Sequence, residues 1–482
     1  MKQSSAFNLL TSPLVISFFL LIILLIAMSN GYMNNDEGMW SYMGRIWSEH
    51  NMPPYIGAIE NKTPGIFELF AISHILFGVN VFFVRALGVI AILLSSLTIY
   101  LTGRELHSHL AGIFSMVIFG LTMTWSLLDG KYTAQTETFM VLFSTLSFYF
   151  VIKGVGSPKW RFWIFLSGLS MGLALAFKQI ALTTAIALFI FFLLYGAYGL
   201  TNKDKIVGIF LVCLGVIIST FLSLAPLLFS NVSLREYIDG AWLILLNPGS
   251  SASAMLRIKG FFHIFLNSRI VVFYPFLGLF IGQSDLIKHR YFIGLLIWML
   301  FDFIGVNASG YYYGHQIKQL IPSLSIIIGI LLGNFLLRHI IEKSELTKYT
   351  SVLLIFIIVL LFPFQSLIGY KAMNGYVDNE KELGMWLKEN TKENDYVYIA
   401  GGRGNAILSY CGRISSSKYF NMIFVTSDKD GEQLLSDLKE KPPLYFLKPS
   451  VDIGIKIDEF VSNNYKLVYT KQEYEIFKWK SD

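Results

Sequence analysis

The chain has few charged residues and almost no cysteine. Asp, Glu, Lys and Arg make up only 15% of its 482 residues, against about 25% in soluble domains, whereas hydrophobic residues make up 54%. A chain this apolar would aggregate in water, so the composition excludes an ordinary soluble protein and predicts a membrane protein with several spans. The two cysteines, Cys213 in an apolar run and Cys411 in the polar tail, exclude a disulfide framework.

Two sequence signals are also missing. No P-loop occurs, so ATP-driven transport has no support. No small-residue cleavage site follows the apolar run at residues 13–28, so we interpret that run as the first transmembrane helix and not as a cleavable signal peptide. The net charge of +6 reflects loop charges that set membrane orientation, and no nucleic-acid partner is expected.

The charges that are present lie mostly at the C-terminal end. Residues 371–482 hold 16 Lys+Arg and 17 Asp+Glu, roughly 29%, whereas the first 370 residues are roughly 10% charged. This contrast predicts a membrane domain at 1–370 and a small soluble domain at 371–482. The tail alternates helix-like and strand-like segments, which is typical of an α/β domain. Helices are expected at 379–390 and 431–441, and strands at 396–400, 444–447, 465–469 and 474–479.

A transmembrane helix needs about 20 largely apolar residues, and about eleven runs in the membrane domain approach this. They lie at 12–30, 80–102, 110–128, 138–153, 161–177, 180–199, 206–229, 268–283, 290–307, 316–337 and 350–369. The run from Phe162 to Leu194 would form a helix of ~50 Å, too long for a hydrocarbon core of ~30 Å. We therefore predict two helices joined by a tight turn at Lys178.

The loop charges predict the orientation in the membrane. Lys and Arg are more frequent in the loops that lie on the same side of the membrane as the N-terminus. This bias places the N-terminus in the cytoplasm. With an odd number of spans, the C-terminal domain is then extracytoplasmic, in a multi-pass protein of the plasma membrane. The first outer loop, 31–79, contains an apolar stretch at 65–77 that is too short to span and is expected to form an interfacial helix.

An acidic pair follows the first predicted span directly. Asp36 and Glu37 lie where charge beside the bilayer is costly. A carboxylate in this position can act as a general base, taking a proton from an acceptor hydroxyl or amine. The alternative is an acidic pair in a solvated loop.

Two lysines are candidates for binding phosphate. Lys62 lies between the acidic pair and the predicted interfacial helix, where a lysine can hold a phosphate as a point charge or simply be a surface residue. Glu60 either orients Lys62 or is solvated. Lys178 is the only charged residue in its 33-residue apolar run. Such residues are as a rule functional or paired, and the alternative is a side chain that extends to the lipid headgroups.

Three further residues lie on the predicted outer side. Glu137 begins the fourth span and is a candidate for polarising an acceptor or ligating a cation, although the helix dipole also favours an acid there, and the sequence alone favours that second interpretation. His315 follows three tyrosines that are typical of membrane interfaces, and it can bond a phosphate or sugar oxygen. Arg257, in the long outer loop, is available to a phosphate or solvated.

The order of these short motifs resembles that of the GT-C superfamily, in particular glycosyltransferase family 39, the aminoarabinose transferases and the protein O-mannosyltransferases. The matching elements are Asp36-Glu37, Pro54-Tyr55, Asn61-Lys62-Thr63-Pro64, Phe77-Gly78 with Arg85, Glu137, Lys178, His315 with Leu320-Ile321-Pro322, and in the tail Gly412-Arg413 and Lys418-Tyr419. Two positions depart from the family pattern. Thr63 replaces a proline, and Gln316 stands where the family usually has an aromatic residue.

The resemblance implies a fold and an activity. The fold is a polytopic α-helical membrane protein of GT-C type with about eleven spans and a small C-terminal α/β extracytoplasmic domain. The activity is inverting transfer of a hexose or pentose from a polyprenyl-phosphate donor to a lipid, protein or cell-wall glycan acceptor on the outer face of the membrane. The competing hypotheses are a lipid-linked glycan flippase or carrier, and a polysaccharide ligase without this base mechanism.

The resemblance also assigns roles to residues. Asp36 is the expected general base, and Glu37 supports it. The donor phosphate is assigned to Lys62, Lys178, His315, Tyr55 and Arg257. Glu137 and Glu60 are assigned to the acceptor or to a metal. No cofactor is certain, and a divalent cation near Asp36 and Glu137 is compatible with the resemblance.

Overall fold

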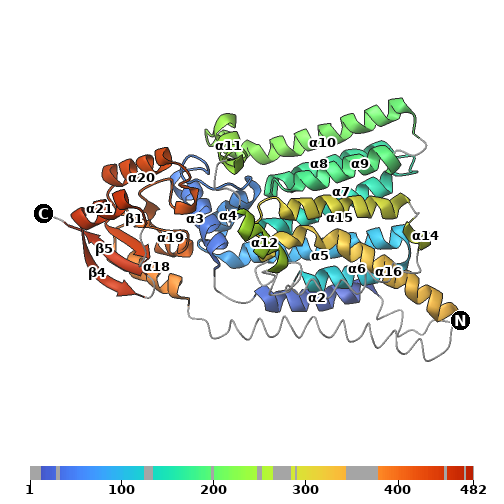
Figure 1. Ribbon diagram of the computed structural model, residues 1–482, viewed down its shortest axis with the longest axis horizontal. Coiled ribbons are helices and arrows are strands. Elements are labelled where there is room, and N and C mark those ends of the chain that lie inside the picture. The colour runs from blue at the N-terminus through green and yellow to red at the C-terminus, as the bar shows by residue number, and fades with distance from the viewer. Residues whose placement is uncertain are drawn as a thin grey trace. The chain divides into compact units, whose positions relative to one another are not determined.

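The computed structural model describes ten segments of the chain, namely residues 12–28, 33–123, 134–196, 200–246, 252–263, 284–287, 290–342, 378–449, 453–471 and 474–480. The chain forms two compact units (Figure 1). The first unit comprises Met1–Asn30, Arg85–Ser223 and Ser251–Gly375. The second comprises Gly31–Val84, Leu224–Ser250 and Tyr376–Asp482.

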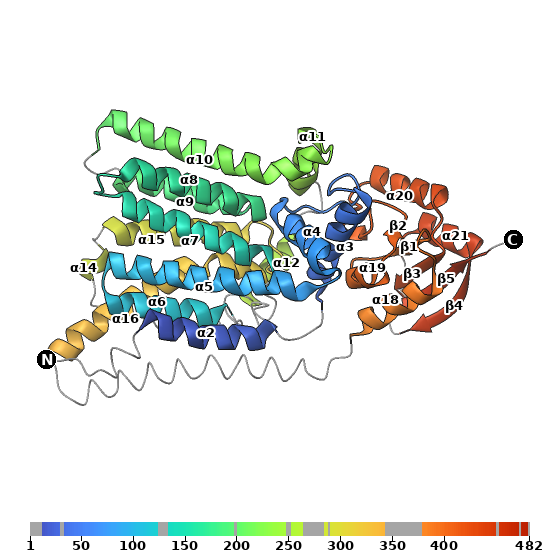
Figure 2. The same ribbon diagram turned by 180° about the vertical axis from the view of Figure 1, so that it is seen from behind.

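The first unit is helical. Its elements are α2 (Pro13–Met28), α5 (Val81–Leu106), α6 (His109–Thr122), α7 (Thr136–Gly154), α8 (Trp160–Phe177), α9 (Ala181–Phe191), η2 (Phe192–Gly196), α10 (Asn202–Phe229), α12 (Ala254–Phe262), α14 (Ser284–Ile287), α15 (Arg290–Asn307), η7 (Gly314–Gln319) and α16 (Ile321–Glu342). Its long helices run roughly parallel to one another in Figures 1 and 2. Within this bundle α7 packs along α8, α6 along α16, and α9 along α15.

Nine of the eleven predicted spans lie on helices of the described residues. The other two, 268–283 and 350–369, lie outside the described residues. By length and composition, α5, α8 and α10 are each long and apolar enough to cross a membrane. Helix α10 also exposes large apolar side chains, with Phe210, Ile217 and Phe221 each more than 60% exposed. Such a surface is typical of a helix whose environment is lipid.

The long apolar run at 162–194 forms two helices, as its length predicts. Helix α8 ends at Phe177, and α9 begins at Ala181. Lys178 lies between them in an extended conformation, with φ −161° and ψ 133°. The turn therefore presents the one charged residue of this run at the ends of two packed helices.

The second unit combines the first loop with the tail. Its helices are α3 (Asn35–His50), α4 (Gly65–Phe77), α11 (Leu234–Ala241), η3 (Leu243–Leu246), α18 (Asn379–Asn390), α19 (Asn405–Cys411), η8 (Met422–Phe424), α20 (Asp428–Glu440) and α21 (Ile455–Asn464). Helix α3 packs against both α4 and α19. The contacts thus group the first loop with the tail, whereas the charge distribution grouped it with the membrane domain.

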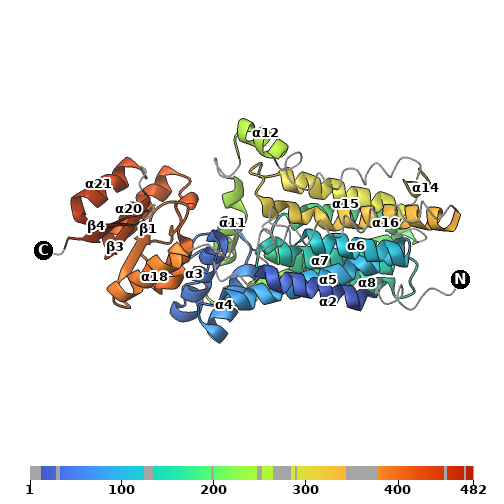
Figure 3. The same ribbon diagram turned by 90° about the horizontal axis from the view of Figure 1, so that it is seen from below.

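A mixed sheet forms the centre of the tail. Its strands are β1 (Tyr396–Ile399), β2 (Ile414–Ser415), β3 (Tyr445–Pro449), β4 (Tyr465–Lys471) and β5 (Tyr474–Trp479), in the order β2-β1-β3-β5-β4. Strand β1 is parallel to β2 and β3, with Val397 opposite Tyr445, and β5 is antiparallel to β3 and β4. Helices α20 and α21 lie on one side of the sheet and α18 on the other (Figure 3).

Most elements of the tail follow the predicted pattern, since α18, α20, β1, β3, β4 and β5 lie where the sequence places them. Helices α3, α19 and α21 were not predicted, nor was the two-residue strand β2. Helix α4 coincides with the apolar stretch at 65–77. Its place at the membrane interface stays a prediction.

Candidate functional site

Glu137, Lys178 and His315 meet in the first unit, although the sequence separates them widely. The Lys178 ammonium forms an ion pair and hydrogen bond with Glu137 Oε1. His315 Nε2 lies 3.7 Å from the same oxygen. The Glu137 side chain is 1% exposed, that of Lys178 15% and that of His315 16%. We call these three residues the Glu137 cluster.

Local structure places each member of the cluster. Glu137 is the second residue of α7, where the helix dipole favours an acid. Thr136 Oγ1 donates a hydrogen bond to Glu137 Oε2 at 2.9 Å. Lys178 lies in the turn between α8 and α9, and His315 lies in the 3-10 helix η7. Lys178 is therefore paired with an acid. Its side chain does not have the arrangement expected of a lysine that extends to the lipid headgroups.

The cluster is charged and largely removed from solvent. A buried carboxylate without a cation is strongly destabilising, so Glu137 depends on Lys178. In return, the carboxylate holds the ammonium at one place. The Lys178 ammonium has three protons and donates one of them to Glu137. Because its side chain is not fully buried, the remaining protons can be presented to an anionic ligand.

His315 ends a short stack of aromatic rings. The rings of Tyr313 and His315 lie 5.8 Å apart with an interplanar angle of 13°, and those of Tyr311 and Tyr313 lie 5.7 Å apart with an angle of 11°. Three ring planes are thus nearly parallel, which limits the orientations of the imidazole.

Arg257 supports the segment that precedes this stack. Its guanidinium donates to the backbone carbonyls of Ala252 at 3.1 Å, Asn307 at 3.2 Å and Ala308 at 3.2 Å. These bonds join α12 to the end of α15. Three of its five donors are therefore engaged with backbone, and the phosphate role implied by the resemblance stays a prediction.

In the second unit, Glu60 and Lys62 form a compact group with Tyr55. Lys62 Nζ lies 2.9 Å from Glu60 Oε1 and 2.8 Å from Asn61 Oδ1. Tyr55 OH donates to the Lys62 carbonyl at 2.6 Å. Glu60 is fully buried and the Lys62 side chain is 22% exposed. Of the two interpretations of Glu60, the contacts favour the one in which it orients Lys62.

The Tyr55 ring is held tightly. The residue has a positive φ of 71°, and its ring packs edge-on against Phe67 and Tyr237. Burial raises the pKa of Tyr55 well above its ordinary value, with neighbouring Tyr237 and acidic groups acting in the same direction. The hydroxyl is therefore a permanent donor, and its proton fixes the backbone at Lys62.

Asp36 and Glu37 occupy the first turn of α3 and not an irregular loop. Asn34 caps this helix: its side chain accepts from Glu37 N at 2.7 Å, and Glu37 Oε2 accepts from Asn34 N at 3.2 Å. Glu37 is fully buried, whereas Asp36 is half-buried. The two adjacent carboxylates thus have different environments. Glu37 is buried and makes the capping bonds of α3, whereas Asp36 is more accessible to solvent.

Helix α15 carries a buried acid that was not identified from the sequence. Asp302 of α15 is 1% exposed, and its Oδ1 accepts from Thr184 Oγ1 at 2.6 Å and from Gln319 Nε2 at 3.0 Å. Gln319 Nε2 also approaches Thr183 Oγ1 and the Ile180 carbonyl. The group joins the helix after the Lys178 turn to the helix that carries His315. Its signal was a lone acid in the apolar run 290–307, the same signal that identified Lys178.

We expect Asp302→Leu to destabilise the protein and Asp302→Asn to be tolerated. Leucine removes the acceptor of the Thr184 hydroxyl, at about 1–3 kcal/mol, and one of the three acceptors near the Gln319 amide, whereas asparagine keeps an acceptor oxygen. Thermal unfolding in detergent should show a lower Tm for the leucine variant only. Equal Tm values for the two variants would mean that the network does not stabilise this part of the bundle.

Glu68 is a second acid that the sequence reasoning did not single out. It lies on α4, which is outside the predicted spans, and burial raises its pKa from 4.5 to about 8. Its Oε1 is buried and has no hydrogen-bond partner within the part of the chain that the structure describes. The neutral, protonated acid is therefore the form that suits this site.

The raised pKa of Glu68 predicts a loss of stability with increasing pH. The native state holds this proton more tightly than the unfolded chain, so its contribution is complete below pH 4.5 and is lost as the pH rises towards about 8. We expect Glu68→Gln, which is neutral at every pH, to have a Tm close to that of the unaltered protein at pH 5 and a higher Tm at pH 9. A difference in Tm that is the same at both pH values would contradict this.

A metal site is not evident among the described residues, where no three His, Cys, Asp or Glu side chains are grouped to hold an ion. The oxygens of Glu137 and Glu60 are engaged with lysines and with Thr136 or backbone. These two acids therefore hold cationic side chains in the structure.

Comparisons with known proteins agree with this architecture. Residues 61–223 match the family model described as dolichyl-phosphate-mannose-protein mannosyltransferase. The structure of ArnT from Cupriavidus metallidurans in the apo state is similar with a TM-score of 0.69 and 12% identity, over 98% of this chain and 98% of that one. The fold is that of the GT-C glycosyltransferases. The resemblance seen in the sequence is thereby confirmed.

Other GT-C structures extend the comparison. ArnT bound to undecaprenyl phosphate is similar with a TM-score of 0.65 and 11% identity, over 96% of this chain and 97% of that one. AglB from Archaeoglobus fulgidus, in complex with an inhibitory peptide and a dolichol-phosphate, has a TM-score of 0.56 and 12% identity, over 91% of this chain and 69% of that one. No curated protein sequence matches the chain significantly.

Proposed function

We propose that this protein is an integral-membrane inverting glycosyltransferase. It transfers a sugar from a polyprenyl-phosphate donor to an acceptor on the outer face of the membrane. The observation that carries the proposal is the Glu137 cluster, in which a fixed ammonium and an imidazole gather at the ends of apolar helices. The lipid phosphates named in two of the similar structures support a donor of this class.

The proposed reaction is a direct displacement. The Asp36 carboxylate takes a proton from the acceptor hydroxyl, and the acceptor oxygen attacks the anomeric carbon of the sugar. The bond from this carbon to the phosphate oxygen breaks, and polyprenyl phosphate leaves with the electron pair. One displacement inverts the anomeric configuration.

The positive groups are proposed to act on the phosphate. Lys62, Lys178 and His315 bind the donor phosphate and stabilise the charge that develops as it leaves, which is an effect stronger in the transition state than in the ground state. Glu60 and Glu137 hold the two lysines. Glu37 supports Asp36 through the start of α3.

Product analysis tests the proposal. The purified protein is incubated in lipid nanodiscs with a polyprenyl phosphate carrying a labelled sugar and with envelope material as the acceptor. We expect release of polyprenyl phosphate and transfer of the label. A carrier or flippase would instead leave the sugar–phosphate bond intact, and that outcome would overturn the proposal. The same assay with a chelator and added divalent cations tests the requirement for a cation.

A further inference from the structure

The helix that carries Asp36 and Glu37 is bound along one face by the C-terminal tail. Helices α3 and α19 approach so closely at Gly38 that a Cβ there would lie 2.5 Å from Ala406 N. On another face, a Cβ at Gly44 would lie 2.6 Å from Ala71 N of α4. Helix α3 is therefore enclosed by α19 and α4, and its two glycines make both approaches possible.

Side chains along α3 bond to the tail at three further levels. Near the start of the helix, Asn35 Nδ2 donates to the Gly402 carbonyl at 3.1 Å and Asn35 Oδ1 accepts from Asn405 Nδ2 at 2.9 Å. In the middle, Ser409 Oγ lies 2.6 Å from Ser41 Oγ. Tyr42 OH accepts a hydrogen bond from the backbone N–H of Ser415, in β2, at 3.0 Å.

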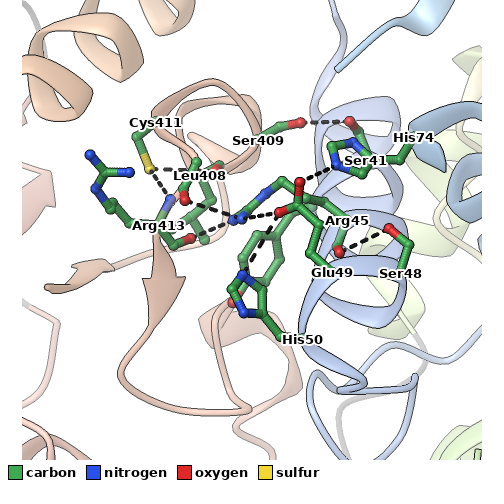
Figure 4. A network of polar contacts seen from close by, with 12 residues as sticks. Ser41, Arg45, Ser48, Glu49, His50, His74, Leu408, Ser409, Cys411 and Arg413 are labelled. Carbon is green, nitrogen blue, oxygen red and sulfur yellow. Dashed lines mark hydrogen bonds and ion pairs between the residues drawn. The ribbon is translucent and has the colours of Figure 1, made fainter. Parts of the chain in front are cut away.

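Arg45 makes the last of these contacts. The residue is 2% exposed, and its guanidinium donates to the Gly412 carbonyl at 3.1 Å and to the Arg413 carbonyl at 2.5 Å (Figure 4). These carbonyls follow the C-terminus of α19, where a cation is electrostatically favoured. Loss of Arg45 would remove a charged donor from both carbonyls, and the contact with the Arg413 carbonyl is buried.

The tail segment that Arg45 contacts is itself held in place. The Arg413 side chain donates to Thr391 Oγ1 at 2.9 Å and to the carbonyls of Lys388 at 3.1 Å and Thr391 at 2.9 Å. This anchors residues 412–413 to the end of α18. On the other side, Glu49 bonds Arg45 at 3.3 Å and His74 of α4 at 2.7 Å (Figure 4). A continuous set of contacts thus runs from α18 through Arg45 to α4.

We propose that the C-terminal α/β domain is a positioning element for the reaction, and that Arg45 is its main contact with α3. The inference rests on the proposed function, because the group it positions is the base Asp36 in the first turn of α3. A helix is stiff over four turns, so bonds at Asn35, Ser41 and Arg45 fix the direction of its start. A general base misplaced by about 1 Å loses on the order of a hundredfold in rate.

The test compares two arginine variants of the full chain in nanodiscs. We expect Arg45→Met to lower kcat about tenfold to hundredfold with the KM for the donor unchanged, because the phosphate-binding residues are not altered. Arg403→Met is the matched control. It removes the same charge from an exposed position in the tail, and its kcat should equal that of the unaltered protein.

An engineered disulfide then tests whether Arg45 acts only by holding α3 against the tail. Ser41→Cys and Ser409→Cys, introduced together with Arg45→Met and with Cys213→Ser, place two thiols where the serine hydroxyls are 2.6 Å apart. We expect oxidation to restore most of kcat and reduction to remove it again. The variant with Ser41→Cys alone should not respond. Failure of oxidation to restore kcat once the bond has formed, or an unchanged kcat in Arg45→Met, would overturn the proposal.

Hydrogen exchange separates this inference from the proposed function. Arg45→Met should increase exchange in α3 whether or not the protein transfers sugar, with no increase in strands β3 and β5. If the unaltered protein transfers no sugar, the proposed function fails, and the exchange of α3 still decides whether the tail holds this helix. Unchanged exchange in α3 would overturn the positioning role.

Discussion

We expect Asp36→Asn to lower kcat by at least about a hundredfold, the contribution of a positioned general base. Asparagine has nearly the same shape but does not accept the proton of the acceptor hydroxyl. Because Asp36 is half-buried in the first turn of α3 and Glu37 carries the capping bonds, the variant should fold and bind donor normally. The measurement is kcat in the transfer assay, together with Tm and donor affinity in the same preparation.

Two further variants make the Asp36 result specific. Asp36→Glu keeps a carboxylate and should retain more activity than Asp36→Asn. Asp239→Asn makes the same chemical change on α11, where the acid is 54% exposed and faces Arg235 at 3.6 Å. An exposed pair of this kind contributes little, so its kcat should not change. Full activity of Asp36→Asn would remove Asp36 as the base.

We expect Lys178→Ala to weaken donor binding about tenfold to hundredfold, because a hydrogen bond to a charged group contributes about 1.5–3 kcal/mol. The ammonium is fixed by Glu137 and is 15% exposed, so it is available to a phosphate with little further ordering. Equilibrium binding of a short-chain polyprenyl phosphate measures the effect. The exposed Lys203 offers a matched control, since Lys203→Ala should leave this affinity unchanged.

Removal of Lys178 also leaves Glu137 buried with less compensation, and this must be separated from the loss of a phosphate contact. The double variant Glu137→Gln with Lys178→Ala removes the buried charge along with its partner. We expect its Tm to recover relative to Lys178→Ala, while donor affinity stays low. Recovery of both would mean that Lys178 stabilises the fold and does not bind donor.

The sequence predicted the helices of the first unit well because each depends on local properties. Apolar runs of about 20 residues specify a helix without reference to the rest of the chain. The turn at Lys178 followed from length alone, and α8 and α9 do end and begin beside it. The same reasoning extends to α4, whose 13 residues match the predicted stretch.

Helix α3 shows why other elements were not predicted. Its 16 residues include two glycines and several charged or polar side chains, a composition that does not favour a helix in isolation. It forms because α19 and α4 pack against those glycines. A local signal was present, since Asn34 and Glu37 have the spacing of a capping box. Helix α19 has only seven residues, too few for a periodic pattern.

The candidate residues were identified by type and position, but not their partners. The sequence singled out Lys178 and Glu137 separately and favoured a simple helix-dipole role for the acid. Their pairing spans 41 positions in the chain, and composition or spacing does not specify which distant helices pack together. Asp302 differs from these two, because its local signal was visible: it is a lone charged residue in an apolar run, as Lys178 is, and it was not singled out.

The sequence by itself predicted apolar helices followed by a charged α/β tail, because hydrophobic runs and the distribution of charge can be recognised without knowing which segments pack together. Only the tertiary structure decided which charges compensate one another. It placed Lys178 and His315 on Glu137, and it placed Arg45 on carbonyls that lie 367 and 368 positions away. Buried charges are stable only beside the groups that satisfy them, and packing alone brings such groups together.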